Sequence, residues 1–398
     1  MHYPAPWTDI GGHEMLPRAM HDEVARFNSI AHLNLFLAQR VVPKVRTAYE
    51  RRAKVSYRLR HGKDPGDRRE VDEAIRRDPA YRAWSALRRN AMEMRQQAGR
   101  SLVLRQAREL RDRASALNVG SPRLRLDAGL DIPAYVGAVD AHLMPGGYTA
   151  ELAPDDVAAA ANYDAGMFAT VGGSAGPWND AAGRALAGWL QHQHPQFKPR
   201  RIVDLGCGVG HNTLPLRRAF PDAEVIGIDV AAPMLRYGHA RARALGVDDV
   251  SFWQEDATCT SLADASCDLV YTTMVLHETS HAALPRLLRE ARRLLRPGGL
   301  TIHLEQPPYR GLEPFEQFLR DWDGRYNNEP FWSALHETAL PALLERAGFE
   351  PRAVFESSCE PPARAAAAAS GQEDFGRAPR WYAVGAWQQG LEHGQSNP

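Results

Sequence analysis

The spacing of hydrophobic residues in the first part of the chain is that of helices. Apolar side chains recur every three or four positions over residues 30–45 and 83–94, which places them on one face of a helix. Glycine and proline within residues 61–67 interrupt the pattern, because both residue types end helices. We therefore predict an all-helical N-terminal domain over residues 1–150, which ends at turn-rich segments such as 144–147.

After residue 150 the pattern changes to short apolar runs that alternate with amphipathic stretches. Short apolar runs bounded by turn signals predict buried strands, and their alternation with helices is typical of a parallel, doubly wound sheet. We assign residues 151–390 to this α/β domain and residues 391–398 to a disordered tail, with a mobile loop at the Ala/Pro-rich stretch 361–369. Helices of this domain are predicted near residues 180–193, 211–220, 233–245, 282–296 and 333–347.

One predicted strand runs directly into a turn with glycine at every second position, at Gly206, Gly208 and Gly210. Residues without a Cβ let the backbone turn sharply and approach a ligand, and the helix that follows offers unpaired N–H groups at its N-terminus. The next predicted strand ends in Asp229, an acid that can accept hydrogen bonds from both hydroxyls of a ribose. The two strands together predict a pocket for a nucleotide-like ligand.

Three more strand-like segments follow in order and end near Asp256, Leu276 and Glu305. The ordered series, which is more specific than any one motif, resembles the class I S-adenosylmethionine-dependent methyltransferases. The resemblance is to the ubiquinone/menaquinone-biosynthesis-like type, which acts on small molecules. It covers residues 160–390 and implies a Rossmann-like, seven-stranded sheet whose last strand, at residues 380–387, is antiparallel.

The glycine turn alone is also compatible with a dinucleotide-binding oxidoreductase, whose fingerprint is G-x-G-x-x-G. His211 stands where that fingerprint requires its third glycine. The departure favours adenosylmethionine over a nicotinamide cofactor, since no pyrophosphate has to fit between the turn and a closely packed helix.

The resemblance implies which residues hold S-adenosyl-L-methionine and its product, S-adenosyl-L-homocysteine. Asp204 and the loop 206–210 would hold the methionine part, Asp229 the ribose and Asp256 the adenine amino group. Tyr163 resembles a tyrosine that closes over the cofactor in related enzymes, where a ring attracts the sulfonium; the alternative for Tyr163 is a packing role. The predicted cofactor-binding residues are Tyr163, Asp204, Gly206, Cys207, Gly208, Gly210, Asp229, Asp256 and Ala257.

Residues 277–281 read His-Glu-Thr-Ser-His, which formally matches the H-E-x-x-H motif of zinc proteases. That motif requires a continuous helix, whereas here it directly follows a predicted strand, so we expect a substrate-facing polar cluster and no metal. His277 is the leading general-base candidate, because an imidazole pKa near ~6.5 suits proton removal at neutral pH; the alternative is a histidine that only orients the loop. Glu278 and Glu305 complete the predicted catalytic set, with Glu305 as an alternative base or a partner for an acceptor ammonium.

A predicted insert at residues 307–332 is rich in aromatic and amide side chains. Such segments commonly wall an acceptor pocket, although packing against the N-terminal helices is an alternative explanation. Its Pro-Pro-Tyr sequence at 307–309 lacks the leading Asp or Asn of amino-methylating nucleic-acid enzymes. The predicted substrate-binding residues are His281, Tyr309, Trp322, Tyr326, Asn327 and Trp332.

Charge is unevenly distributed along a chain whose net charge is zero, since residues 1–150 carry 26 Lys/Arg against 17 Asp/Glu. Such asymmetry can mark a nucleic-acid-binding arm. The basic residues are interspersed with acids, however, which favours two oppositely charged domains that dock on each other, or solvated helices.

The four cysteines lack paired spacing, and the N-terminus lacks a charged start before an apolar run. No apolar stretch is long enough to span a bilayer, so we expect a soluble, cytoplasmic protein. The sequence as a whole predicts an adenosylmethionine-dependent methyltransferase that transfers a methyl group to a small-molecule acceptor by an SN2 mechanism. The N-terminal helices would cap the pocket or form a homodimer. The alternatives are an RNA or DNA methyltransferase that uses the basic helices, and a protein that binds adenosylmethionine without methylating. The acceptor atom stays open.

Overall fold

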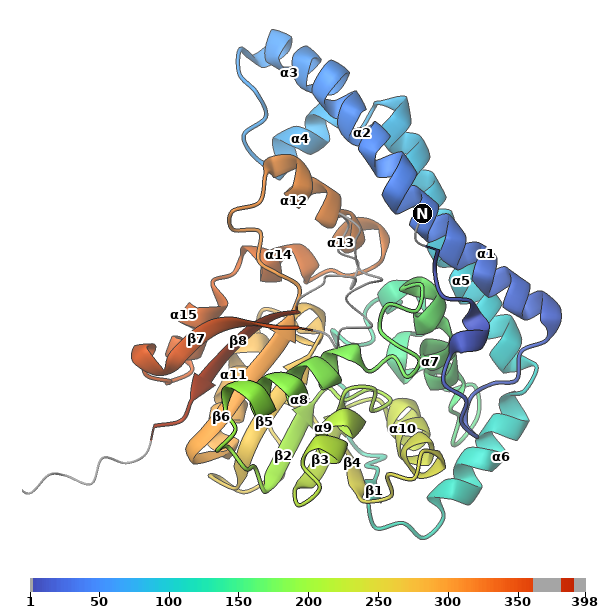
Figure 1. The fold of residues 1–398 in the computed structure, drawn as a ribbon, viewed down its shortest axis with the longest axis vertical. Helices are drawn as coiled ribbons and strands as arrows, with labels where there is room; N and C mark the ends of the chain where they lie inside the picture. The colour runs from blue at the N-terminus through green and yellow to red at the C-terminus, as the bar shows by residue number, and fades with distance from the viewer. Residues whose placement is uncertain (1–2, 361–380, 390–398) are drawn as a thin grey trace, which may run out of the picture.

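The N-terminal region is built from helices, as its hydrophobic spacing predicts. The computed structural model describes residues 3–360 and 381–389; the predicted loop at 361–369 and tail at 391–398 lie outside the described residues. Helices α1, α2 and α3 follow one another and form the blue arm of Figure 1. The bounds are α1 His21–Phe36, α2 Val42–Ala48, α3 Lys54–His61, α4 Arg68–Ile75, α5 Pro79–Leu104 and α6 Ala107–Asn118, with π-helical turns at Leu37–Val41 and Tyr49–Ala53.

The breaks between these helices have local causes. Gly62 follows α3 in the left-handed conformation, with φ of 71°, which glycine adopts without strain. The side chain of Asp67 caps α4 by accepting hydrogen bonds from two N–H groups of its first turn. Asp78 caps α5, and Pro79 occupies the first turn, where its missing N–H costs nothing. The interruption predicted at residues 61–67 therefore lies between α3 and α4.

Within the described residues, an eight-stranded sheet forms the centre of the α/β part, in the order β1-β4-β3-β2-β5-β6-β8-β7. Paired strands run parallel except for β8, which is antiparallel to β6 and β7. The predicted Rossmann-like class and its antiparallel last strand are confirmed. The sequence pattern does not predict β1, because two residues are too few to show a periodicity. The bounds are β1 Leu124–Arg125, β2 Arg201–Leu205, β3 Glu224–Asp229, β4 Val250–Gln254, β5 Cys267–Thr273, β6 Leu295–Glu305, β7 Val354–Cys359 and β8 Trp381–Trp387.

Alternate residues of the strands pack against helices on opposite faces of the sheet, as the two-residue period of a strand requires. Ile202 of β2 belongs to a core with α8, α9 and α10, while Val203 belongs to a second core with α11 and α15. The helix predicted at 333–347 is instead two helices, since Pro341 lies in the first turn of a new one. The bounds are α7 Ala158–Thr170, α8 Ala181–Gln193, α9 Thr213–Ala219, α10 Ala232–Ala244, α11 Leu284–Leu294, α14 Trp332–Glu337 and α15 Leu340–Arg346.

The N-terminal helices share hydrophobic cores with the α/β part. Leu110 of α6 and Val103 of α5 pack in one cluster with Met234 and Tyr237 of α10. Another cluster joins α2, α4 and α5 to the insert helices α12 (Pro314–Arg320) and α13 (Trp322–Tyr326). The boundary at residue 150 stays a prediction.

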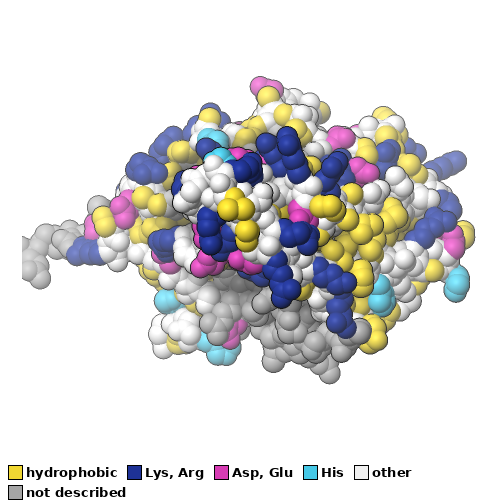
Figure 2. Space-filling model, turned by 90° about the horizontal axis from the view of Figure 1, so that it is seen from above, with side chains coloured by type: hydrophobic (Ala, Val, Ile, Leu, Met, Phe, Trp, Pro, Cys, Tyr) yellow, Lys and Arg dark blue, Asp and Glu magenta, His cyan; other side chains and the backbone are white. Residues whose placement is uncertain are grey.

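Charged side chains are dispersed over the N-terminal helices. Figure 2 looks at the molecule from the end that carries α3 and shows Lys and Arg side chains spread among acidic and hydrophobic ones. Among the residues that the structure describes, no helix is long and apolar enough to cross a membrane.

Candidate functional site

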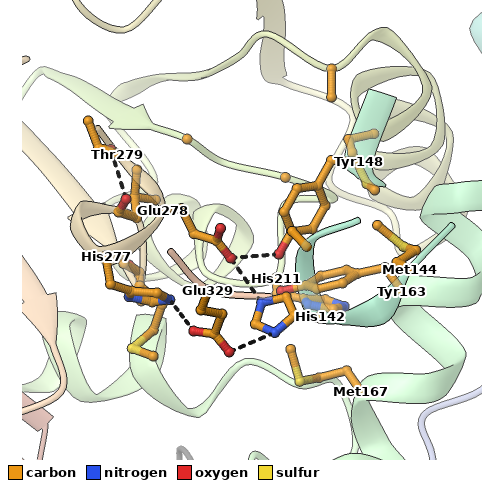
Figure 3. A pocket seen from close by; sticks show the side chains of 18 of the residues that line it. His142, Met144, Tyr148, Tyr163, Met167, His211, His277, Glu278, Thr279 and Glu329 are labelled. Atoms are coloured by element: carbon orange, nitrogen blue, oxygen red, sulfur yellow. Dashed lines mark hydrogen bonds and ion pairs between the residues drawn. The ribbon is translucent and has the colours of Figure 1, made fainter. Parts of the chain in front are cut away.

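A cavity of about 350 Å³ lies at the carboxyl ends of the parallel strands. Its walls come from the glycine turn after β2, the ends of β3, β4 and β5, and helices α5 and α7. Ligands of open α/β sheets bind at this edge. Figure 3 shows side chains from α7, from the segments after β2 and β5, and from residues 142–148 converging on one space.

The glycine turn has the backbone that the sequence predicts. Gly206, Gly208 and Gly210 all have positive φ, at 82°, 53° and 77°. A Cβ on Gly206 would lie 2.6 Å from the side chain of Val275, so a larger residue has no room there. Gly206 and Gly208 line the cavity, whereas Gly210 packs against the ring of Phe252.

Asp204 is a buried acid at the cavity wall. Its Oδ2 accepts hydrogen bonds from Thr213 Oγ1 at 2.6 Å and Tyr271 OH at 3.0 Å. Its Oδ1 is buried and has no hydrogen-bond partner among the described residues. Burial raises the pKa of Asp204 to about 7, because the ionised form loses its water. A cationic group placed in the cavity would restore the lost stabilisation of this charge.

Two further acids end neighbouring strands and line the same cavity. Asp229 Oδ2 accepts from Gly208 N at 2.9 Å, and its Oδ1 accepts from Ala231 N at 2.9 Å. Asp256 Oδ1 accepts from Thr258 N at 2.8 Å. Burial raises the pKa of Asp229. Eight of the nine predicted cofactor-binding residues line this one cavity, and Gly210 is the exception.

Tyr163 lies on α7 with its ring stacked on His211, at 5.6 Å between ring centroids. The ring of Tyr148 meets it edge-on at 5.8 Å. His211 is held by Asp164, at 2.7 Å between Nε2 and Oδ1. Tyr163 is thus positioned at the cavity wall, and its role over the cofactor stays a prediction.

His277 lies in a single 3-10 turn, Leu276–Glu278, so the H-E-x-x-H segment does not form a continuous helix. Its Nδ1 is 2.8 Å from Glu305 Oε2, and its Nε2 is 3.8 Å from Glu329 Oε2. Although burial opposes the charge, these carboxylates and Glu278 raise the pKa of His277 to about 9. The pKa of His277 therefore lies above the expected value near ~6.5, and His277 holds a proton at neutral pH.

Glu305 lies behind His277 and not at the cavity wall. Its other oxygen accepts from Leu276 N at 2.6 Å, and the side chain is fully buried. Burial opposes ionisation, but His277 lowers the pKa of Glu305. Both of its oxygens are occupied by these contacts, and its predicted catalytic role stays a prediction.

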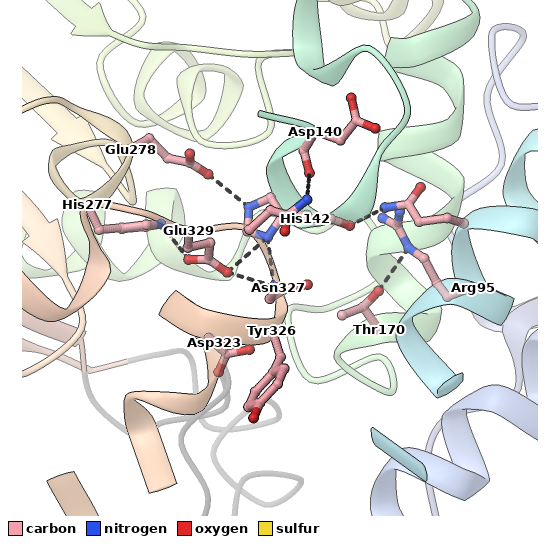
Figure 4. A network of polar contacts seen from close by, with 12 residues as sticks. Arg95, Asp140, His142, Thr170, His277, Glu278, Asp323, Tyr326, Asn327 and Glu329 are labelled. Atoms are coloured by element: carbon pink, nitrogen blue, oxygen red, sulfur yellow. Dashed lines mark hydrogen bonds and ion pairs between the residues drawn. The ribbon is translucent and has the colours of Figure 1, made fainter. Parts of the chain in front are cut away.

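Glu278 faces the cavity and belongs to a network that reaches the N-terminal region. Its Oε1 accepts from Tyr148 OH at 3.1 Å and lies 2.9 Å from His142 Nε2. The other ring nitrogen of His142 is 3.1 Å from Glu329 Oε1. Burial opposes ionisation of Glu278, but His142 lowers the pKa of Glu278 to about 2. Figure 4 shows the contacts of His142 with Glu278 and Glu329, and Figure 3 shows that of Tyr148 with Glu278.

The sequence analysis did not predict His142 or Tyr148 as site residues, and it placed Glu329 only within the insert that could wall an acceptor pocket. His142 and Tyr148 stand in short turns with no motif around them. The one local signal is the positive φ of His142, 51°, which is uncommon for a residue with a Cβ and is seen only in the structure. Glu329 lies in the predicted insert, next to the amide Asn327, which donates to it at 2.6 Å.

The predicted substrate-binding residues separate into two groups. Asn327 and Trp332 line the cavity. The other four do not: Trp322 donates from Nε1 to Ser85 of α5 at 2.8 Å, and Tyr326 packs beside it. The remaining two are His281, which is exposed and meets the ring of Phe331, and Tyr309, whose hydroxyl donates to Asp321. Part of the insert therefore packs against the N-terminal helices, which is the alternative explanation of its composition.

Comparison with known proteins identifies the segment that carries the glycine turn. Residues 202–299 match the family described as methyltransferase domain. The chain is 38% identical over 117 residues to malonyl-[acyl-carrier protein] O-methyltransferase of Methylococcus capsulatus, covering 29% of this chain and 40% of the relative. It is 38% identical over 110 residues to demethylmenaquinone methyltransferase of Thermus thermophilus, covering 28% and 49%. It is 35% identical over 166 residues to trans-aconitate 2-methyltransferase of Methylobacterium radiotolerans, covering 41% and 57%. The chain thus spans about half the length of the curated relatives it matches.

Proposed function

We propose, from the premise that residues 202–299 form a class I S-adenosylmethionine-dependent methyltransferase domain, that this protein methylates a small-molecule acceptor. The observation that carries the proposal is Asp204, a buried acid in the same cavity as Asp229 and Asp256, one of whose oxygens has no hydrogen-bond partner within the described part of the chain. A buried acid without a cationic partner among the described residues suits the positively charged adenosylmethionine.

The residues present fit this cofactor. Asp204 would accept from the methionine ammonium, Asp229 would accept from the ribose hydroxyls, and Asp256 would accept from the adenine amino group. The bound cofactor supplies an electrophilic methyl group. The contribution of the chain is to align the reactants and to exclude water.

Proton removal from the acceptor is assigned to Glu329, which lies beside His277. Glu329 Oε2 is buried and makes no hydrogen bond with the described residues, and it faces His277 Nε2 across 3.8 Å. Because His277 is protonated at neutral pH, Glu329 Oε2 is the atom of this pair placed to accept a proton. Glu305 is a positioning residue that holds the imidazole.

Calorimetric titration with S-adenosylmethionine, S-adenosylhomocysteine and NADH tests the proposal. We expect micromolar binding of both sulfur compounds and no binding of NADH. An acceptor screen that detects released S-adenosylhomocysteine then follows. Binding of NADH alone would refute the proposal, and cofactor binding without product release across the screen would show a protein that binds adenosylmethionine without methylating.

The small-molecule acceptor is supported by the local pairing of the basic residues. On the N-terminal helices, Arg52 contacts Asp78 and Arg58 contacts Asp64, at 2.9 and 2.6 Å. Charges that are already paired release fewer counterions on nucleic acid. We expect binding to duplex or single-stranded oligonucleotides to be weak, and steep dependence on salt would argue for the nucleic-acid alternative.

We also propose a homodimer through the N-terminal helices and a cytoplasmic location. Helices α1 and α3 expose Phe36, Val55 and Leu59, with 52%, 44% and 83% of each residue accessible. The four cysteines are free, which suits a reducing compartment. Light scattering should give twice the chain mass, and Leu59→Lys should shift it toward the monomer; a monomeric wild type would contradict the dimer.

A further inference from the structure

Arg95 is a buried cation at the cavity wall that has no carboxylate partner among the described residues. It lies on α5, is 5% exposed, and donates from Nε to Thr170 Oγ1 at 3.1 Å. Its Nη1 and Nη2 make no hydrogen bond within residues 3–360 and 381–389, and no acid there pairs with it. Figure 4 shows Arg95 and Thr170 beside the His142 network.

Arg88, two turns earlier on the same helix, is the contrasting case. Its Nη2 lies 3.0 and 3.1 Å from the two oxygens of Asp323. Both arginines are buried and line the cavity, but only Arg88 has its charge compensated by the described part of the chain. A buried cation without a counter-ion is costly, so its retention needs a reason.

The surroundings hold the Arg95 guanidinium in place. A Cβ on Gly166 would lie 2.7 Å from Arg95 Cζ, so glycine leaves the space that the guanidinium fills. Thr170 donates to Gly166 O at 3.0 Å and accepts from Arg95, which orients the side chain from α7. Burial lowers the pKa of Arg95 to about 10, and the group therefore stays charged at neutral pH.

We propose that Arg95 binds a carboxylate of a ligand inside this cavity through its two Nη atoms. The planar guanidinium fork matches the two oxygens of a carboxylate, which a lysine ammonium does not. The inference rests on the proposed function and adds a ligand group to it. The carboxylate belongs either to the methionine part of the cofactor or to the acceptor, and the experiment separates these sources.

The test compares Arg95→Met, which removes the charge, with Arg95→Lys, which keeps charge without the fork. Arg105→Gln is the matched control, because Arg105 follows the same helix, pairs with Glu23 and lies away from the cavity. Dissociation constants are measured for S-adenosylhomocysteine and for its carboxamide analogue, which lacks the carboxylate. Malonate and trans-aconitate are then titrated into the protein saturated with S-adenosylhomocysteine.

If Arg95 binds the cofactor carboxylate, Arg95→Met should weaken the binding of S-adenosylhomocysteine at least tenfold and leave the affinity for the carboxamide unchanged. An acceptor carboxylate predicts unchanged S-adenosylhomocysteine affinity and a tenfold or greater loss of dicarboxylate binding. In both cases Arg95→Lys should lie between wild type and Arg95→Met, and Arg105→Gln should match wild type.

The unfolding midpoint of the ligand-free protein provides an independent readout. If Arg95 serves a ligand, Arg95→Met should unfold at the wild-type temperature or above it, because an uncompensated buried charge is removed. A lowered midpoint together with unchanged affinities for all the probes would overturn the inference. Failure of the wild type to bind S-adenosylhomocysteine would instead refute the proposed function.

Discussion

Asp204, which is buried, and Glu278, which is half-buried, are carboxyl groups of the same cavity, and their pKa values move in opposite directions. Burial without a cationic partner raises the pKa of Asp204 to about 7. Burial also opposes ionisation of Glu278, but contact with His142 lowers its pKa to about 2. The two pKa values differ because only Glu278 has a cationic partner, and not because of the residue type. A buried acid without a cationic partner is a candidate site for a ligand cation, whereas Glu278 already belongs to a network of side chains.

Asp229→Ala tests the ribose assignment. Loss of the carboxylate should weaken the binding of S-adenosylhomocysteine by about 1–3 kcal/mol, since hydrogen bonds to a charged acceptor are lost. Calorimetry measures the change. Asp229→Asn, which keeps an acceptor for Gly208 N–H, is the matched control and should lose less. Equal affinity of the alanine variant and wild type would remove Asp229 from the site.

The pH dependence of stability tests the charge state of His277. Because its pKa in the folded protein is raised from 6.5 to about 9, its contribution is complete below pH 6.5 and is lost as pH rises toward 9. At about 1.4 kcal/mol per pKa unit, the free energy of unfolding should fall by roughly 2–4 kcal/mol across this window.

The control for this prediction is His277→Phe, measured by urea unfolding over the same range of pH. The pKa of His142 is also raised and contributes with the same sign, so the difference between the two proteins isolates His277. The lowered pKa of Glu305 affects stability only at acid pH, because the contribution of Glu305 to the free energy of unfolding is lost as pH falls below 4.5. Parallel pH profiles of wild type and His277→Phe would contradict the protonated imidazole.

At the scale of elements, two glycines of helix α8 have different surroundings that the sequence pattern does not distinguish. Both Gly183 and Gly188 lie within it. A Cβ on Gly183 would lie 2.6 Å from the backbone oxygen of Asn212, just after the glycine turn, whereas nothing lies within 4 Å of a Cβ on Gly188. The close approach of α8 to this turn supports the cavity wall, and helical periodicity does not reveal it.

Alanine substitutions at these two glycines should therefore have opposite effects. Gly188→Ala should stabilise the protein by about 0.5–1 kcal/mol, because alanine restricts the unfolded chain and favours helix. Gly183→Ala should destabilise it by about 1–3 kcal/mol, because the backbone of the turn has to move, and should weaken S-adenosylhomocysteine. Chemical denaturation and calorimetry measure both effects. Equal stabilities of the two variants would contradict the packing described for Gly183.

At the scale of the whole molecule, the cavity is closed by parts of the chain that are far apart in sequence. Arg95 and Gln96 come from α5, and Gln96 Nε2 donates to His142 O at 2.7 Å. Shared hydrophobic cores join these helices to the α/β part. A ligand that fills the cavity would therefore contact both halves of the molecule.

Ligand binding should stabilise both halves together. At 100 times its dissociation constant, S-adenosylhomocysteine should raise the free energy of unfolding by about 2.7 kcal/mol. Hydrogen exchange should show slower exchange in α5, over residues 79–104, as well as around the glycine turn. Slowing confined to residues 200–260 would show that the N-terminal helices do not close the site.

Local patterns of the chain determined much of this protein. The helical N-terminal region, the alternation of strands and helices, the glycine turn and the acids Asp204, Asp229 and Asp256 all follow from periodicity or from short motifs. These features depend on neighbours in sequence, and the carboxyl ends of parallel strands necessarily meet at one edge of the sheet.

Only the tertiary structure decided which polar residues meet in the cavity and what charge they carry. His142 and Arg95 reach it from the N-terminal region, while Trp322 and Tyr309 of the insert turn away from it. The pKa of His277 depends on carboxylates 28 and 52 positions further along the chain, at Glu305 and Glu329. Burial and pairing are properties of the packed molecule, because they depend on distances that close only when the chain folds.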